Sequence, residues 1–108
     1  MYDIIALGEI LIDFALKSTD EAGYPIMEAH PGGAPLNFLS ALTKYGKRTA
    51  QLGKVGGDAF GRLLLGTLDQ NGISTEGIVI DQDVFTTLAF VTLDAFGNRE
   101  FSFARKPG

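Results

Sequence analysis

The residues best suited to chemistry lie around Asp13 and in the stretch His30–Asn37. Gly32 and Gly33 have no Cβ, so the backbone there can adopt positive φ and come close to a ligand. The proline that follows them suits the first turn of a helix, where its missing N–H would have no partner anyway. We therefore predict a glycine loop that opens a helix, whose free N–H groups favour anions or hydroxyl oxygens. The Asn37 amide in that first turn can donate and accept hydrogen bonds. The alternative interpretation is an ordinary tight turn before a helix, which has the same spacing of residues.

Asp13, Arg105 and His30 each have a functional and a structural interpretation, whereas Asp58 has a structural one. Asp13 follows an apolar run, where α/β sheets bind ligands, but a solvated acid in a turn has the same pattern. Arg105, near the end of a strand-like segment, is either a surface charge or an anchor for an oxygen-rich ligand. His30 is the only histidine and is more typical of a loop than of a catalyst. Asp58 is expected to cap a helix.

The elements that must position these residues follow from the hydrophobic pattern. Residues 3–7 predict a strand that is buried on both faces, as in a parallel sheet. Residues 15–29 are a loop or a pair of short edge strands, and 86–105 predict a hairpin with one covered and one more open face. The other expected elements are a helix ending at Gly46, a strand at 49–55, a helix at 59–70 and a strand at 77–80. This alternation of strands and helices indicates an α/β fold with a parallel sheet.

Composition narrows the classes of protein and partner. The 108 residues carry a formal net charge of −4, which argues against a nucleic-acid partner because such a partner requires a basic face. The chain has no cysteine, so it has neither a disulfide framework nor a thiolate zinc site. There is no basic leader, and no apolar run approaches the roughly 20 residues of a membrane span. A cytoplasmic location fits these features.

In combination, the motifs resemble the N-terminal part of a sugar kinase of the ribokinase family, also called the phosphofructokinase-B family. Gly8-Glu9 and Asp13 resemble its opening strand and its sugar-contacting aspartate, and residues 32–37 resemble its first signature. Gly46 and Gly56 fall at the downstream glycine positions of that signature, and residues 55–61 resemble the stretch that follows. Leu39 departs from the pattern, since the signature has a small residue there.

The resemblance implies a fold and a set of site residues. The fold would be the N-terminal part of a ribokinase-like α/β fold, with core segments at 1–14 and 31–80 and a small β-sheet lid from about 15–30 and 85–105. Its sugar-contacting residues would be Asp13, Gly32, Gly33, Asn37 and Arg105. The aspartate and the asparagine would bind sugar hydroxyls, the glycines would let the backbone approach, and the arginine would hold the sugar from the lid side.

Residues 97–108 most resemble fructokinases, while 2-keto-3-deoxygluconate kinases and ribokinases remain alternatives within the family. The resemblance implies that the parent enzyme uses ATP and Mg²⁺, whose sites lie farther along, as does the catalytic aspartate of a Gly-Ala-Gly-Asp motif. We expect a truncated N-terminal segment that is inactive alone, binds no cofactor or membrane, and forms homodimers through its lid strands. Other classes left open are a non-catalytic sugar-binding or dimerisation module and an anion-binding domain that uses the glycine loop.

Overall fold

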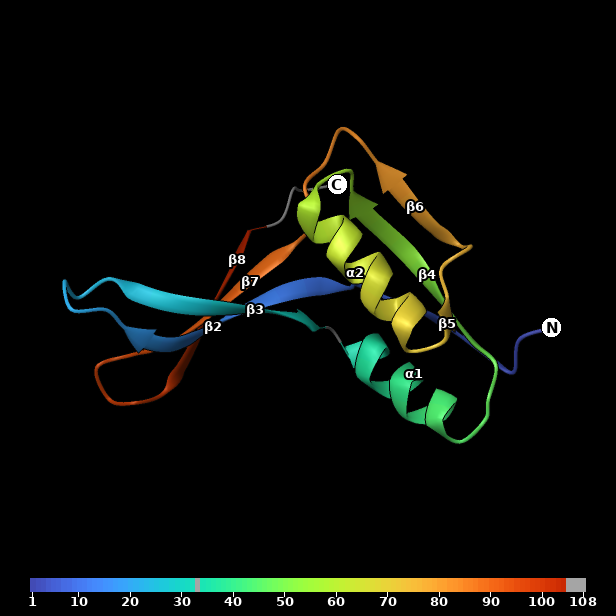
Figure 1. Cartoon of the computed structure of the whole chain (residues 1–108), viewed down its shortest axis with the longest axis horizontal. Helices are drawn as coiled ribbons and strands as arrows, with labels where there is room; N and C mark the ends of the chain where they lie inside the picture. The colour runs from blue at the N-terminus through green and yellow to red at the C-terminus, as the bar shows by residue number, and fades with distance from the viewer. Residues whose placement is uncertain (33, 105–108) are drawn as a thin grey trace.

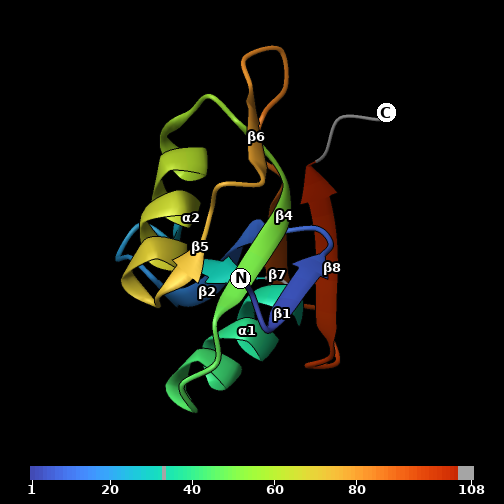
Figure 2. The same ribbon diagram turned by 90° about the vertical axis from the view of Figure 1, so that its right-hand side faces the viewer.

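The computed structural model describes residues 1–32 and 34–104, which form eight strands and two helices in two sheets. In the first sheet, β4 (Thr49–Gly56) pairs in parallel with each of the other three strands. Those strands are β1 (Ile4–Leu7), β5 (Ile73–Ser74) and β6 (Ile78–Asp81). Figure 2 shows β4 with α2 (Ala59–Gln70) alongside it. The predicted α/β class with parallel strands is confirmed.

The second sheet consists of two antiparallel hairpins joined by one parallel pair of strands. Its order is β3-β2-β7-β8, and it extends away from the helices (Figure 1). The strands are β2 (Leu11–Thr19), β3 (Pro25–Gly32), β7 (Leu88–Leu93) and β8 (Arg99–Ala104). Of the two possibilities for residues 15–29, the pair of strands is correct, but only β3 lies at an edge, because β2 pairs with both β3 and β7.

The two helices bury one apolar stripe each against β1, β2 and β4. From α1 (Ala34–Lys44), Leu39 is fully buried, and from α2 Leu64 and Leu68 are fully buried in the same cluster as Ile12 of β2. Burying aliphatic side chains of this size is the main favourable contribution to folding. The helix predicted at 59–70 has the observed bounds, and Asp58 caps it by accepting a hydrogen bond from Gly61 N at 2.7 Å.

Three details differ from the sequence prediction. Burial of the first strand on both faces is wrong: Ile4 and Ala6 pack on the core, whereas Ile5 and Leu7 are exposed, because both helices pack against one face. The expected covered face of the second hairpin is wrong for β8, which is exposed along its whole length. The two-residue strand β5 went unpredicted, because it is too short to show a periodicity.

The glycine stretch also differs from the expected loop. Gly32 is the last residue of β3, and α1 begins at Ala34. Among the described glycines, positive φ occurs at Gly23, Gly46, Gly72 and Gly97, so Gly32 is not used for that conformation. No helix in the described part of the chain is long and apolar enough to cross a membrane.

Leu64 and Leu63 are neighbours on α2, but their exposed fractions are 0% and 41%. Substituting each by alanine therefore tests which face of α2 packs against the core. We expect Leu64→Ala to lower the free energy of unfolding by about 2–5 kcal/mol, because it leaves a cavity, and Leu63→Ala to lower it by less than about 1 kcal/mol. Urea denaturation of both variants measures the difference. Equal losses would place the core on another face of α2.

Candidate functional site

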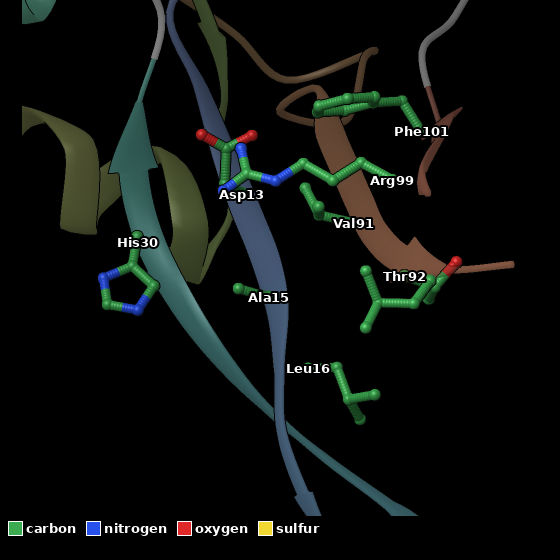
Figure 3. A pocket seen from close by; sticks show the side chains of 9 residues that line it. Asp13, Ala15, Leu16, His30, Val91, Thr92, Arg99 and Phe101 are labelled. Carbon is green, nitrogen blue, oxygen red and sulfur yellow. The ribbon is translucent and has the colours of Figure 1, made fainter. Parts of the chain in front are cut away.

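A pocket of about 470 Å³ lies on the second sheet (Figure 3). Phe14, which follows the lining residue Asp13 in β2, packs instead against Phe60 of α2. All four strands of the sheet contribute to the pocket. Its lining residues are Asp13, Ala15, Leu16, His30, Val91, Thr92, Leu93, Arg99 and Phe101. The volume lies in the range of about 300–1,000 Å³ that is typical of small-molecule sites.

The strand register explains why these residues meet. Asp13 lies opposite His30 on β3 and beside Ala89 on β7. Val91 of β7 lies opposite Phe101 of β8. Side chains at paired positions share one face of a sheet, so the register places most of the lining on one face. Leu16 and Thr92, which directly follow lining residues in β2 and β7, also contribute.

Asp13 is the carboxylate that the pocket presents to a ligand. It is half-buried, and among the residues that the structure describes it has no hydrogen-bond or ion-pair partner. Both oxygens therefore remain available as acceptors. A half-buried carboxylate without a partner loses solvation without compensation, which favours a ligand that donates hydrogen bonds.

Gly32 makes room for that carboxylate. A Cβ at Gly32 would overlap Oδ2 of Asp13 and lie 3.1 Å from its Cγ. The glycine is thus required by close approach of a side chain and not by backbone conformation. Asp13 and Gly32 are the two predicted site residues that the structure brings into contact.

Donors and apolar groups surround the carboxylate. Arg99 extends from β8 towards Asp13 (Figure 3), and Phe101 and Val91 add apolar surface. On the β3 side, Glu28 lies 3.2 Å from His30 Nε2 and 3.1 Å from Lys17 Nζ. Hydrogen bonds from Lys17 and then from His30 lower the pKa of Glu28, so β2 and β3 carry charges of both signs next to the lining residues Ala15 and His30.

The remaining predicted site residues lie elsewhere. Asn37 is exposed in the first turn of α1, and within the described ranges it is not part of the pocket lining. Gly33 and Arg105 lie outside the described residues. The sequence interpretation missed His30, Arg99 and Phe101 as pocket residues. The alternation of residues 99–103 was the available signal, but the partner strands that complete the pocket were not predictable from it.

An acceptor carboxylate, a donor guanidinium and an apolar wall together suit a ligand with several hydroxyl groups and an apolar ring face. Within residues 1–32 and 34–104, no group of three or more histidine, cysteine, aspartate or glutamate side chains is placed to hold a metal ion. The side chains that line the pocket therefore support binding of a polyhydroxyl compound.

Several known proteins that resemble this chain in sequence or in structure carry the name fructokinase. The chain is 47% identical over 106 residues to the Arabidopsis thaliana protein named "Probable fructokinase-4", covering 96% of this chain and 32% of that protein. A fructokinase structure from Xylella fastidiosa superimposes with a TM-score of 0.88 at 37% identity, covering 94% of this chain and 32% of that one. A structure of fructokinase with bound ATP from the same organism gives a TM-score of 0.87 at 33% identity, covering 97% and 34%.

The chain thus spans about a third of the length of the relatives that it matches. The pattern of the pfkB family carbohydrate kinases matches residues 1–107. This match, almost the full length of the chain, shows that the chain belongs to the pfkB family of carbohydrate kinases.

Proposed function

We propose that this chain supplies the sugar-binding part of an ATP-dependent carbohydrate kinase that phosphorylates a hydroxyl of fructose. The observation that carries the proposal is the free Asp13 carboxylate, seated against Gly32 in an open pocket of a fold shared with fructokinases. A cytoplasmic location of the parent enzyme belongs to the same proposal.

The proposed roles follow from the chemistry of each group. Asp13 accepts hydrogen bonds from sugar hydroxyls. Asn37, which lies outside the lining of the pocket, is assigned a further hydroxyl on the motif resemblance alone. Gly32 and Gly33 let the backbone and the carboxylate approach the sugar closely. Arg105 contacts the sugar from the side of the second sheet. These roles are supported by the contact between Asp13 and Gly32 and, for the other residues, by the resemblance of the sequence motifs.

We assign the second sheet, β3-β2-β7-β8, the role of a lid over the sugar. Its pocket face is open and its strands extend away from the helices (Figure 1). Closing such a sheet over the sugar would exclude water, which competes with the sugar hydroxyl for the phosphoryl group. The first sheet and its helices would stay fixed as the platform.

The nucleotide side of the reaction is assigned to residues other than these 108. In kinases, ATP with Mg²⁺ supplies the phosphoryl group, and the protein positions it and stabilises the developing charge. Within the described ranges no three histidine, cysteine, aspartate or glutamate side chains gather around a metal position, and in kinases Mg²⁺ is held by one or two carboxylates together with the phosphates of the nucleotide. The sequence also has no Gly-Ala-Gly-Asp motif. We therefore expect no sugar-dependent ADP release from this chain alone.

A sugar acid is the second candidate substrate, favoured by one observation. Arg99 lines the pocket as a cation, and a guanidinium binds a carboxylate such as that of 2-keto-3-deoxygluconate. Ribose is the third compound to test, because ribokinases belong to the same family. Calorimetric titration with the three compounds ranks them, and tighter binding of the sugar acid would overturn fructose as the substrate.

Asp13→Asn tests the central contact. We expect it to raise the dissociation constant for fructose at least about tenfold, because hydrogen bonds to a charged group contribute about 1.5–3 kcal/mol. The matched control is Asp69→Asn, which neutralises an exposed carboxylate on α2. Isothermal titration calorimetry measures both variants. Equal affinities of the two would contradict the proposed role of Asp13.

Gly32→Ala tests whether the glycine positions the carboxylate. The added Cβ meets the end of a flexible side chain, so Asp13 should rotate away at a cost in stability below about 1.5 kcal/mol. Fructose binding should be lost, while Gly66→Ala, whose Cβ meets no atom within 4 Å, should leave it unchanged. Calorimetry and thermal unfolding measure the two effects. Unchanged binding by Gly32→Ala would contradict the prediction.

We further propose a homodimer in which the lid sheets of two copies cover one another. Phe101 on the pocket face of β8 is 55% exposed, and Phe38 on α1 is exposed to the same fraction. Phe101→Asp should dissociate the dimer, because it places a charge in an apolar interface, whereas Phe38→Asp should not. Sedimentation equilibrium measures both. A monomeric wild-type chain, or dissociation by Phe38→Asp alone, would contradict the dimer through the lid.

A further inference from the structure

The segment that leads into β7 is held by the turn before α2. Thr86 is buried, and its backbone N–H donates to Oδ2 of Asp58 at 2.9 Å. Its hydroxyl donates to Oδ1 of Asp58 at 2.8 Å and accepts from Gly56 N at 3.1 Å. Asp58 thus contacts a residue 28 positions farther along the chain through both carboxylate oxygens. Capping of α2 requires only one of these oxygens, which accepts from Gly61 N.

The junction is too closely packed for any side chain at its two glycines. A Cβ at Gly56 would lie 2.5 Å from Val84 O and 2.6 Å from Thr86 N. A Cβ at Gly61 would overlap the carbonyl oxygen of Gly56. The β4–α2 turn and the start of β7 therefore fit together in one arrangement.

The charge of Asp58 strengthens the contact. Burial acts to raise the pKa of Asp58, but the hydrogen bonds from Thr86 N, Gly61 N and the Thr86 hydroxyl outweigh it, and the pKa lies below its usual value. The carboxylate is thus ionised at neutral pH. Hydrogen bonds to an ionised acceptor are roughly twice as strong as neutral ones.

The junction leads into β7, the strand that contributes Val91, Thr92 and Leu93 to the pocket. The carbonyl of Thr87 accepts a hydrogen bond from Ile12 N at 3.1 Å. From there β7 pairs with β2, Leu88 with Ile12 and Ala89 with Asp13. Ala89 is almost fully buried. The strand beside the Asp13 carboxylate is therefore fixed three residues earlier, at Thr86.

We propose that Asp58 and Thr86 are positioning residues for sugar binding, which hold β7 in register beside Asp13. This role rests on the proposed function, because it assumes that the Asp13 pocket binds the sugar. Asp58 thus has two roles. It caps α2, and its charge holds β7, which forms one wall of the pocket.

Three variants of the 108-residue chain separate these roles. Thr86→Val removes the hydroxyl and both of its hydrogen bonds, whereas Thr86→Ser retains them. Asp58→Asn keeps an oxygen that can cap α2, since asparagine caps as well as aspartate, but its amide group replaces one acceptor for Thr86. Thr67→Val is the matched control, since the Thr67 hydroxyl donates only within α2, to Leu63 O at 2.9 Å.

Two measurements are made on each variant: amide hydrogen exchange of β7 and β4, and calorimetric titration with fructose. For Thr86→Val and Asp58→Asn we expect exchange protection of β7 to fall, and the fructose dissociation constant to rise, by about tenfold, the factor that corresponds to ~1.4 kcal/mol. Protection of β4 should be retained. Thr86→Ser and Thr67→Val should behave as the wild type.

The outcomes distinguish this inference from the proposed function. Unchanged β7 protection, or an equal loss of protection in β4, would overturn the positioning role. Selective loss of β7 protection with unchanged fructose affinity would show that the contact serves the fold alone, and would also overturn it. If the wild-type chain binds no fructose while β7 is selectively loosened, the proposed function fails and the anchoring of β7 by Asp58 is supported.

Discussion

The two-residue alternation of β2 is the constraint on which the rest of the structure depends. Ile12 is fully buried in the core, and Phe14 packs edge-on against Phe60 of α2 and stacks on Phe90 of β7, with ring centroids 5.4 and 5.3 Å apart. Asp13, between them, faces the opposite side. Because a slip of one residue would exchange the two faces, the packing of the core against α2 also determines that the carboxylate faces the pocket.

The pairing of β2 with β7 brings together segments that are far apart in the sequence. Residues 12–15 lie beside 88–91, and without this pairing the two hairpins would be separate ribbons. Since two-stranded ribbons are marginally stable on their own, the second sheet depends on this pair and on the hydrogen bonds of Thr86 and Thr87 that precede it. Because β2 and β7 both line the pocket, a substitution in the segment before β7 can change the geometry of the pocket without touching its lining.

Elements with strong local signals were predictable. The helix at 59–70 has an apolar stripe, a capping aspartate and a terminal Asn-Gly pair, and its observed bounds are the predicted ones. Asp13 was a candidate because an apolar run precedes it, but the structure places it inside β2 and not at the end of a strand or in a turn. Motif resemblance pointed to the family that the match over residues 1–107 shows. The roles of Asp13, Gly32, Gly33, Asn37 and Arg105 stay predictions. The contact of Gly32 with Asp13 and the pocket positions of His30 and Arg99 depend on strand pairing, which no local pattern encodes.

Mapping fructose onto the backbone amides by NMR tests the central claim most directly, because it locates the ligand without any substitution. We predict saturable shift changes at Asp13, His30, Val91 and Phe101, on the pocket face of four strands, with small changes elsewhere. Changes confined to the exposed end of the first sheet around Met1, Lys47 and Glu76, or no saturable change at millimolar fructose, would contradict the assignment of the sugar site to this pocket.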